Sequence, residues 1–145
     1  MSRFPPASLH ISELQTLERL LDRGQDFFRA EALLHVQVEG HALPVWSIEM
    51  GSTAADAPVA GFFGGIHGME RIGSQILLAW LESLAARAVW DISLQQLLQE
   101  VRILCMPLVN IGGLVMNTRA NPNGVDLMRN APVEARGITA WPLGG

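Results

Sequence analysis

The chain has 145 residues, of which 49% are hydrophobic and 17% are charged. This length favours one globular domain over residues 1–145, burying roughly 68–70% of its unfolded surface. The net charge of −4 argues against a basic surface for nucleic acid or for an anionic membrane. No apolar run approaches the roughly 18 residues that cross a bilayer, and the N-terminus lacks the apolar region of a signal peptide. We therefore expect neither nucleic acid nor membrane as a partner, and a cytoplasmic location.

The first predicted element is a helix over "SELQTLERLLDRG", residues 12–24. Ser12 is the expected N-cap, Gln15 stands where a capping box needs it, and Gly24 is the expected stop. Two alternating runs follow, "LLHVQVEG" and "LPVWSIEMG", and they predict a hairpin with Gly40 in the turn. The histidines of this region, His35 and His41, are expected at the rim of the domain rather than as metal ligands.

The middle of the chain reads as strand, helix, strand. The nearly all-apolar run "VAGFFGGIHG", residues 59–68, predicts a strand buried on both faces. A long helix is expected in 69–89, and its apolar stripe comprises Ile72, Ile76, Leu77, Trp80, Leu81 and Leu84. A shorter helix with Asp91 near its start leads to a second buried strand, "VRILCMPLVN", which contains Cys105 as a buried structural thiol. This order predicts a right-handed crossover and an α/β fold, with loops from Ile111 onward.

The stretch "GGIHGME" brings two metal-binding residue types to the end of the first buried strand. His67 stands just beyond the strand, and Glu70 opens the next helix. Imidazole nitrogen and carboxylate oxygen both bind zinc, at roughly 2.0–2.2 Å. Taken alone the pair is a weak signal, because a glutamate at a helix start is also stabilised by the helix dipole.

A second cluster, "TRANPNGVDLMRN", follows about fifty residues later and carries Arg119 and Arg129. In their order and content the two motifs together resemble the M14 zinc carboxypeptidase family, over roughly Val59 to Asn130. The resemblance implies a three-layer α/β fold, in which a mixed, mostly parallel sheet has helices on both faces.

The resemblance also implies a role for each matching residue. His67 and Glu70 correspond to zinc ligands, and Arg119 to the catalytic arginine that polarises the scissile carbonyl. Arg129, with Asn130 beside it, corresponds to the group that binds the terminal carboxylate of the substrate. The implied reaction is hydrolysis of a peptide or acyl-amino acid by water that zinc activates. These roles suit the residue types, because a guanidinium binds a carboxylate bidentately and stabilises a developing oxyanion.

The chain departs from the family pattern in two places. Met128 stands where the family has Asn, and a thioether is a poor hydrogen-bonding partner for a terminal carboxylate. No His follows Arg129, and Glu134 is the only acidic residue there, so a third ligand and a general base are missing. We therefore expect an incomplete catalytic domain that is inactive alone, with an open sheet edge prone to self-association.

Three alternatives follow from these residues. A zinc acylase of the aspartoacylase or succinylglutamate desuccinylase type would suit the missing Asn. A non-catalytic module could use Arg119 and Arg129 to hold an anion. A dinucleotide-binding fold is disfavoured, because "GFFGGIHG" lacks the G-x-G-x-x-G spacing.

Overall fold

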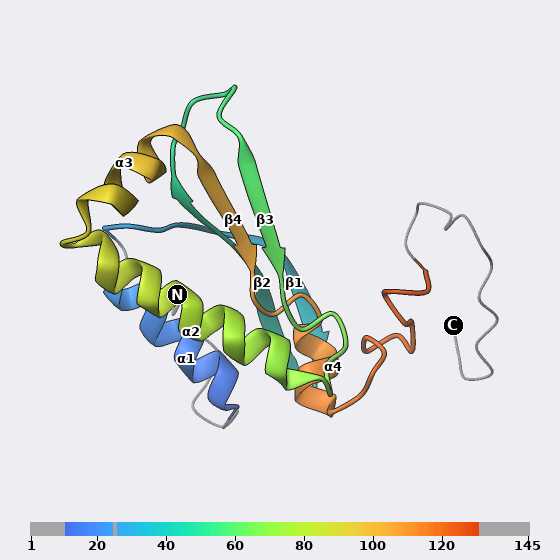
Figure 1. The fold of residues 1–145 in the computed structure, drawn as a ribbon. Coiled ribbons are helices and arrows are strands. Elements are labelled where there is room, and N and C mark those ends of the chain that lie inside the picture. The colour runs from blue at the N-terminus through green and yellow to red at the C-terminus, as the bar shows by residue number, and fades with distance from the viewer. Residues whose placement is uncertain (1–10, 25, 131–145) are drawn as a thin grey trace.

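The computed structural model describes residues 11–24 and 26–130 as one four-stranded sheet with associated helices (Figure 1). The strands lie in the order β1-β2-β4-β3. In chain order the elements are α1 (Ser12–Arg23), β1 (Arg29–Val38), β2 (His41–Gly51), β3 (Val59–Phe63), α2 (Arg71–Ala88), α3 (Ile92–Glu100), β4 (Arg102–Met106) and α4 (Ile111–Met116). None of the described helices is long and apolar enough to cross a membrane.

The predicted hairpin is confirmed. Strands β1 and β2 pair antiparallel, and the turn between them places Glu39 and Gly40 at positive φ values of 48° and 77°. Two consecutive positive φ angles give a turn whose twist matches that of the flanking strands. The α/β class and the mixed sheet are also confirmed. The described strands are not mostly parallel, however, because β2 pairs antiparallel with both β1 and β4, and only β3 and β4 pair parallel.

Helices α1 and α2 lie side by side against the sheet, and the crossover from β3 to β4 runs through α2 and α3 (Figure 1). The core between strands and helices includes Ile48, Leu78 and Leu81, which are almost completely buried. Cys105 on β4 is fully buried as predicted, and burial raises the pKa of its thiol to about 12. A thiol that stays protonated and enclosed is structural rather than reactive.

The predicted strand at 59–68 is present as β3, but its expected burial on both faces is wrong. All five residues of β3 are exposed, with Phe63 at 56%. The strand is apolar, yet it lies at the edge of the sheet. Trp80 of α2 packs against Phe62, with ring centroids 4.7 Å apart, but still leaves Phe62 42% exposed. Ile72 and Ile76 of α2, which the predicted apolar stripe placed in the core, are exposed as well. The expected open edge is therefore present, while self-association through it stays a prediction.

Two further expectations are wrong, namely the capping of α1 and the absence of a helix after Ile111. Ser12 is the first residue of α1 rather than its cap, and no capping box forms, since Ile11 precedes the helix without a side-chain hydrogen bond. Gly24 does end α1, and Asp91 caps α3 by accepting a hydrogen bond from the Leu94 amide. The short helix α4 lies where only loop was expected. Its two consecutive glycines are typical of a loop, but Asn110 caps the helix.

Candidate active site

The chain between β3 and α2 is held tightly against the exit of β4. The Gly64 amide donates to the Met106 carbonyl at 2.9 Å, and the Asn110 amide donates to the Gly65 carbonyl at 2.8 Å. Gly65 adopts a φ of 66°, a backbone conformation that residues with a Cβ atom rarely adopt. A Cβ at Gly68 would overlap the backbone of Gly113 in α4. These contacts fix the turn that carries His67.

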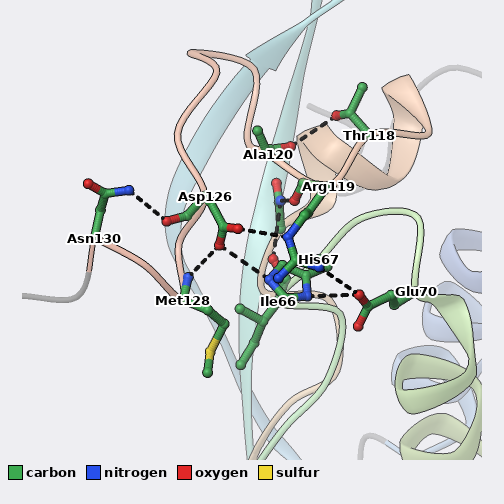
Figure 2. Close-up of polar contacts among 10 residues, drawn as sticks. Ile66, His67, Glu70, Thr118, Arg119, Ala120, Asp126, Met128 and Asn130 are labelled. Atoms are coloured by element: carbon green, nitrogen blue, oxygen red, sulfur yellow. Dashed lines mark hydrogen bonds and ion pairs between the residues drawn. The ribbon is translucent and has the colours of Figure 1, made fainter. Parts of the chain in front are cut away.

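His67 lies between two carboxylates (Figure 2). Its Nδ1 is 3.1 Å from Oε1 of Glu70, and its Nε2 is 3.3 Å from Oδ1 of Asp126. The imidazole is only 11% exposed, whereas the Glu70 side chain is 58% exposed. An ionised carboxylate only accepts hydrogen bonds, so a proton on either ring nitrogen is donated to the carboxylate beside it.

Arg119 joins the same cluster from the loop after α4. Its Nε donates to Oδ2 of Asp126 at 2.7 Å, and its Nη1 donates to Oε1 of Glu70 at 3.1 Å (Figure 2). The structure thus brings together three of the predicted site residues, namely His67, Glu70 and Arg119. Their side chains come from segments about fifty residues apart in the sequence.

Asp126 is the centre of this cluster, and sequence analysis assigned no role to it. It is buried, and it also accepts the Met128 amide at 3.0 Å. The hydrogen bond from Arg119 lowers the pKa of Asp126 to about 2, and those from Met128 and His67 act in the same direction, against the effect of burial. Its place within "GVDL", close to Arg119 and Arg129, was the available signal. No periodicity or spacing rule identifies its partner, which lies 59 residues away.

Asn110 is a second residue that sequence reasoning missed. Its buried side chain caps α4 by accepting from the Gly113 amide at 2.9 Å. Its Nδ2 donates to the Ile66 carbonyl at 3.2 Å and to the Arg119 carbonyl at 3.3 Å. The side-chain amide of Asn110 therefore links the loop of His67 to the loop of Arg119, and it holds both loops against the start of α4.

The remaining predicted residues lie on the turn after Asp126. The Arg129 amide donates to the Asp126 carbonyl at 3.1 Å, and its side chain lies on the exposed part of the turn. The Asn130 side chain donates to the same carbonyl at 2.9 Å and lies away from His67 in Figure 2. Met128 is exposed and lines a hollow of about 360 Å³ together with His67 and Glu70.

The His67 and Glu70 pair fits one metal ion. Two ligand atoms about 2.1 Å from a tetrahedral zinc ion lie about 3.4 Å apart, and Nδ1 and Oε1 are 3.1 Å apart. Asp126 stands on the opposite side of the ring, where it orients the imidazole as partners behind metal-bound histidines do. Among residues 11–24 and 26–130, no group of three or more His, Cys, Asp or Glu could hold a metal. The described residues therefore offer two candidate ligands at this point.

Comparison with known proteins agrees with this geometry. The profile of the zinc carboxypeptidase family, Peptidase M14, matches residues 26–142. The chain belongs to the zinc carboxypeptidase family. Both motifs lie inside the match, and so do Asp126 and Asn110. The resemblance seen in the sequence is thereby confirmed.

Individual members of the zinc carboxypeptidase family are similar over limited regions. Carboxypeptidase E of Caenorhabditis elegans is 34% identical over 110 residues, covering 66% of this chain and 23% of its own length. Carboxypeptidase SOL1 of Arabidopsis thaliana is 28% identical over 95 residues, covering 63% of this chain and 19% of its own. The chain thus spans about a fifth of the length of these curated relatives.

Solved structures confirm the fold. A metallo-carboxypeptidase from Burkholderia cenocepacia superposes with a TM-score of 0.66 at 22% identity, covering 81% of this chain and 32% of that one. Thrombin activatable fibrinolysis inhibitor gives a TM-score of 0.60 at 19% identity, covering 79% and 31%. The described sheet and helices therefore have the architecture of the corresponding part of a zinc carboxypeptidase.

Several hollows open on the described part of the chain. One of about 490 Å³ is lined by Leu34, Val45 and Asn121 among others, and contains neither His67 nor Glu70. The hollow of about 360 Å³ contains both, so it is the candidate site. Its lining includes Phe63, Ile66 and Met128, which surround the polar pair with apolar side chains.

Replacing Asp126 by Asn is expected to reduce zinc affinity by about 10- to 100-fold, the usual cost of removing a partner behind a metal-bound histidine. The amide keeps the shape of the side chain but loses the charge that holds both Arg119 and the His67 ring. Competition with a chromogenic chelator measures the affinity. Asp56→Asn, in the loop before β3, is the matched control and should bind zinc like the parent. Equal affinity in D126N would show that Asp126 does not orient the ligand.

Proposed function

We propose that this chain carries the zinc-binding part of a carboxypeptidase-type metallopeptidase that hydrolyses a peptide or amide bond. The observation that carries the proposal is the separation of 3.1 Å between Nδ1 of His67 and Oε1 of Glu70, with Asp126 behind the ring. Family membership supports the same assignment. His67 and Glu70 would hold the zinc ion, which when bound lowers the pKa of water to about 7 and polarises a carbonyl.

Asp126 and Arg119 have separate roles in the proposed reaction. With zinc at Nδ1, the ring proton of His67 would lie on Nε2, where Oδ1 of Asp126 would accept it and hold the ring. Arg119 is anchored to Asp126 through Nε, while its Nη1 contacts the exposed carboxylate of Glu70. In the proposed reaction Nη1 is redirected to the oxygen of the scissile carbonyl, where a fixed positive charge stabilises the developing oxyanion.

Arg129 is proposed to bind a substrate carboxylate, with Asn130 holding the turn on which it lies. The two-ligand site falls short of the three protein ligands usual for catalytic zinc. We propose that the third ligand and the general base are supplied by residues outside the described part. The isolated chain would then bind zinc weakly and hydrolyse nothing.

A zinc acylase is the second candidate function, and Met128 favours it. Met128 is 54% exposed and shares the hollow with the ligand pair, where an amide would help to hold a terminal carboxylate. An apolar side chain there suits an acyl group better than a charge. The two candidates share the metal centre and differ in what Met128 faces.

Zinc titration of the chain, followed by a hydrolysis panel, tests the proposed function. We expect one zinc ion per chain by equilibrium dialysis with metal analysis, and its removal by EDTA. A longer protein that contains this chain should hydrolyse either dipeptides or N-acyl amino acids when loaded with zinc, which separates the two candidates. Binding of small carboxylates without any zinc binding would instead support an anion-binding module and contradict a metallopeptidase.

A further inference from the structure

A buried carboxylate on helix α1 contacts Arg71, the residue that follows Glu70. Glu13 is 2% exposed, although it belongs to the first turn of its helix. Its Oε1 accepts Nε2 of Gln75 at 2.7 Å, and its Oε2 accepts the Ser12 hydroxyl and Nη1 of Arg71, each at 3.1 Å. Burial raises the pKa of Glu13, but these hydrogen bonds and the charge of Arg71 outweigh it and leave the pKa below its ordinary value. The carboxylate is therefore charged.

This arrangement is costly for a purely structural contact. An ionised carboxylate loses much of its hydration on burial, and well-packed apolar residues often stabilise a protein equally well or better. The buried Glu13 and the half-buried Arg71 instead form a polar network at the start of α2, joined by the exposed side chains of Ser12 and Gln75. Such networks are better explained by the geometry that they specify than by stability.

The network holds Arg71, the residue that follows Glu70, in a defined position. Arg71 is the first residue of α2, and its side chain reaches Glu13 in α1. Its Nη2 also approaches the Leu114 carbonyl in α4 at 3.5 Å. Gln75 adds a contact from the next turn of α2. The beginning of α2 is thus held from two other helices.

Outside this network, the chain entering α2 is held by the Met69 amide, which donates to the Thr118 carbonyl at 3.1 Å. Glu70 precedes α2 without forming a side-chain cap, and its backbone amide donates to the His67 carbonyl at 3.1 Å. Its carboxylate is exposed and reaches toward His67 and Arg119, so the side chain depends on where the backbone of α2 begins. A displacement of about 1 Å at a catalytic group can cost about 100-fold in rate.

We propose that Glu13 is a positioning residue, which acts through Arg71 to hold the start of α2 where Glu70 meets His67. The inference rests on the proposed zinc site. It assigns to α1, which contributes no ligand, control over the second ligand. Because the proposed route runs from Glu13 through Arg71, most of the effect of changing Glu13 must disappear when Arg71 is already changed.

Zinc affinity of the full chain, measured by chelator competition, tests the proposal. Glu13→Gln should weaken zinc binding by about 3- to 10-fold, less than loss of a direct partner of the ligand. Arg71→Met should have a similar effect, and the double variant should bind no more weakly than either single one. Glu18→Gln, on the same helix, is the matched control and should bind like the parent.

A stability control separates positioning from general weakening. Leu20→Val loosens the core contact of α1 while keeping the helix, and its zinc affinity should stay at the parent value. If E13Q does not fold, Arg71→Met answers the same question from the less buried partner. Unchanged affinity in E13Q or R71M, or losses that add in the double variant, would overturn the role of Glu13 alone. Absence of zinc binding in the parent would overturn the proposed function and this inference with it.

Discussion

Replacing His67 by alanine is expected to lower zinc affinity by about 100-fold or more. Removing only a partner behind a metal-bound histidine costs about 10- to 100-fold, so losing the ligand itself should cost at least the upper end of that range. Glu70 would remain as the only one of the two proposed ligands, on an exposed side chain paired with Arg119. Chelator competition at fixed pH measures the change, with circular dichroism to confirm that the variant is folded.

His35→Ala is the matched control for this experiment. His35 lies exposed on β1, where the sequence already argued against a ligand, and its loss should leave zinc affinity unchanged. If H67A retained the affinity of the parent while H35A lost it, the metal would lie elsewhere, and the chemistry proposed for the hollow beside β3 would have no basis. Equal affinities in all three proteins would indicate nonspecific binding.

The sequence predicted those parts of the fold that depend on local pattern. The alternation over 33–51 predicted the hairpin, and Gly40 marked its turn, since both are consequences of backbone geometry. Burial was predicted less well. The apolar run of β3 indicates what the strand can bury, whereas its exposure depends on what lies next to the sheet, which no local pattern contains.

In the candidate site, too, local motifs were predicted from the sequence and tertiary contacts were not. His67, Glu70 and Arg119 could be named because two motifs carry them, and the structure brings the three side chains together. Asp126 could not be assigned, because its role follows from the packing of the loop after α4 against the turn after β3. Glu13 is further from any motif, and only the meeting of α1 and α2 shows that it matters.

Replacing Gly68 by alanine is expected to destabilise the chain by about 3 kcal/mol or more, at the upper end of the usual cost of overpacking. A Cβ there would overlap the backbone of Gly113 and Leu114, and neither can move aside as a flexible side chain could. The thermal midpoint should fall by roughly 6–12 °C, as measured by circular dichroism or calorimetry.

Gly73→Ala gives the opposite expectation only five residues away. A Cβ at Gly73 meets nothing within 4 Å, and the position is exposed on α2. Alanine there should stabilise the chain by about 0.5–1 kcal/mol, because glycine is a poor helix former. The two glycines look alike in the sequence, but only Gly68 lies where α4 touches the turn between His67 and Glu70. If G68A were as stable as G73A, that close approach would be wrong, and with it one reason that the two proposed ligands stay together.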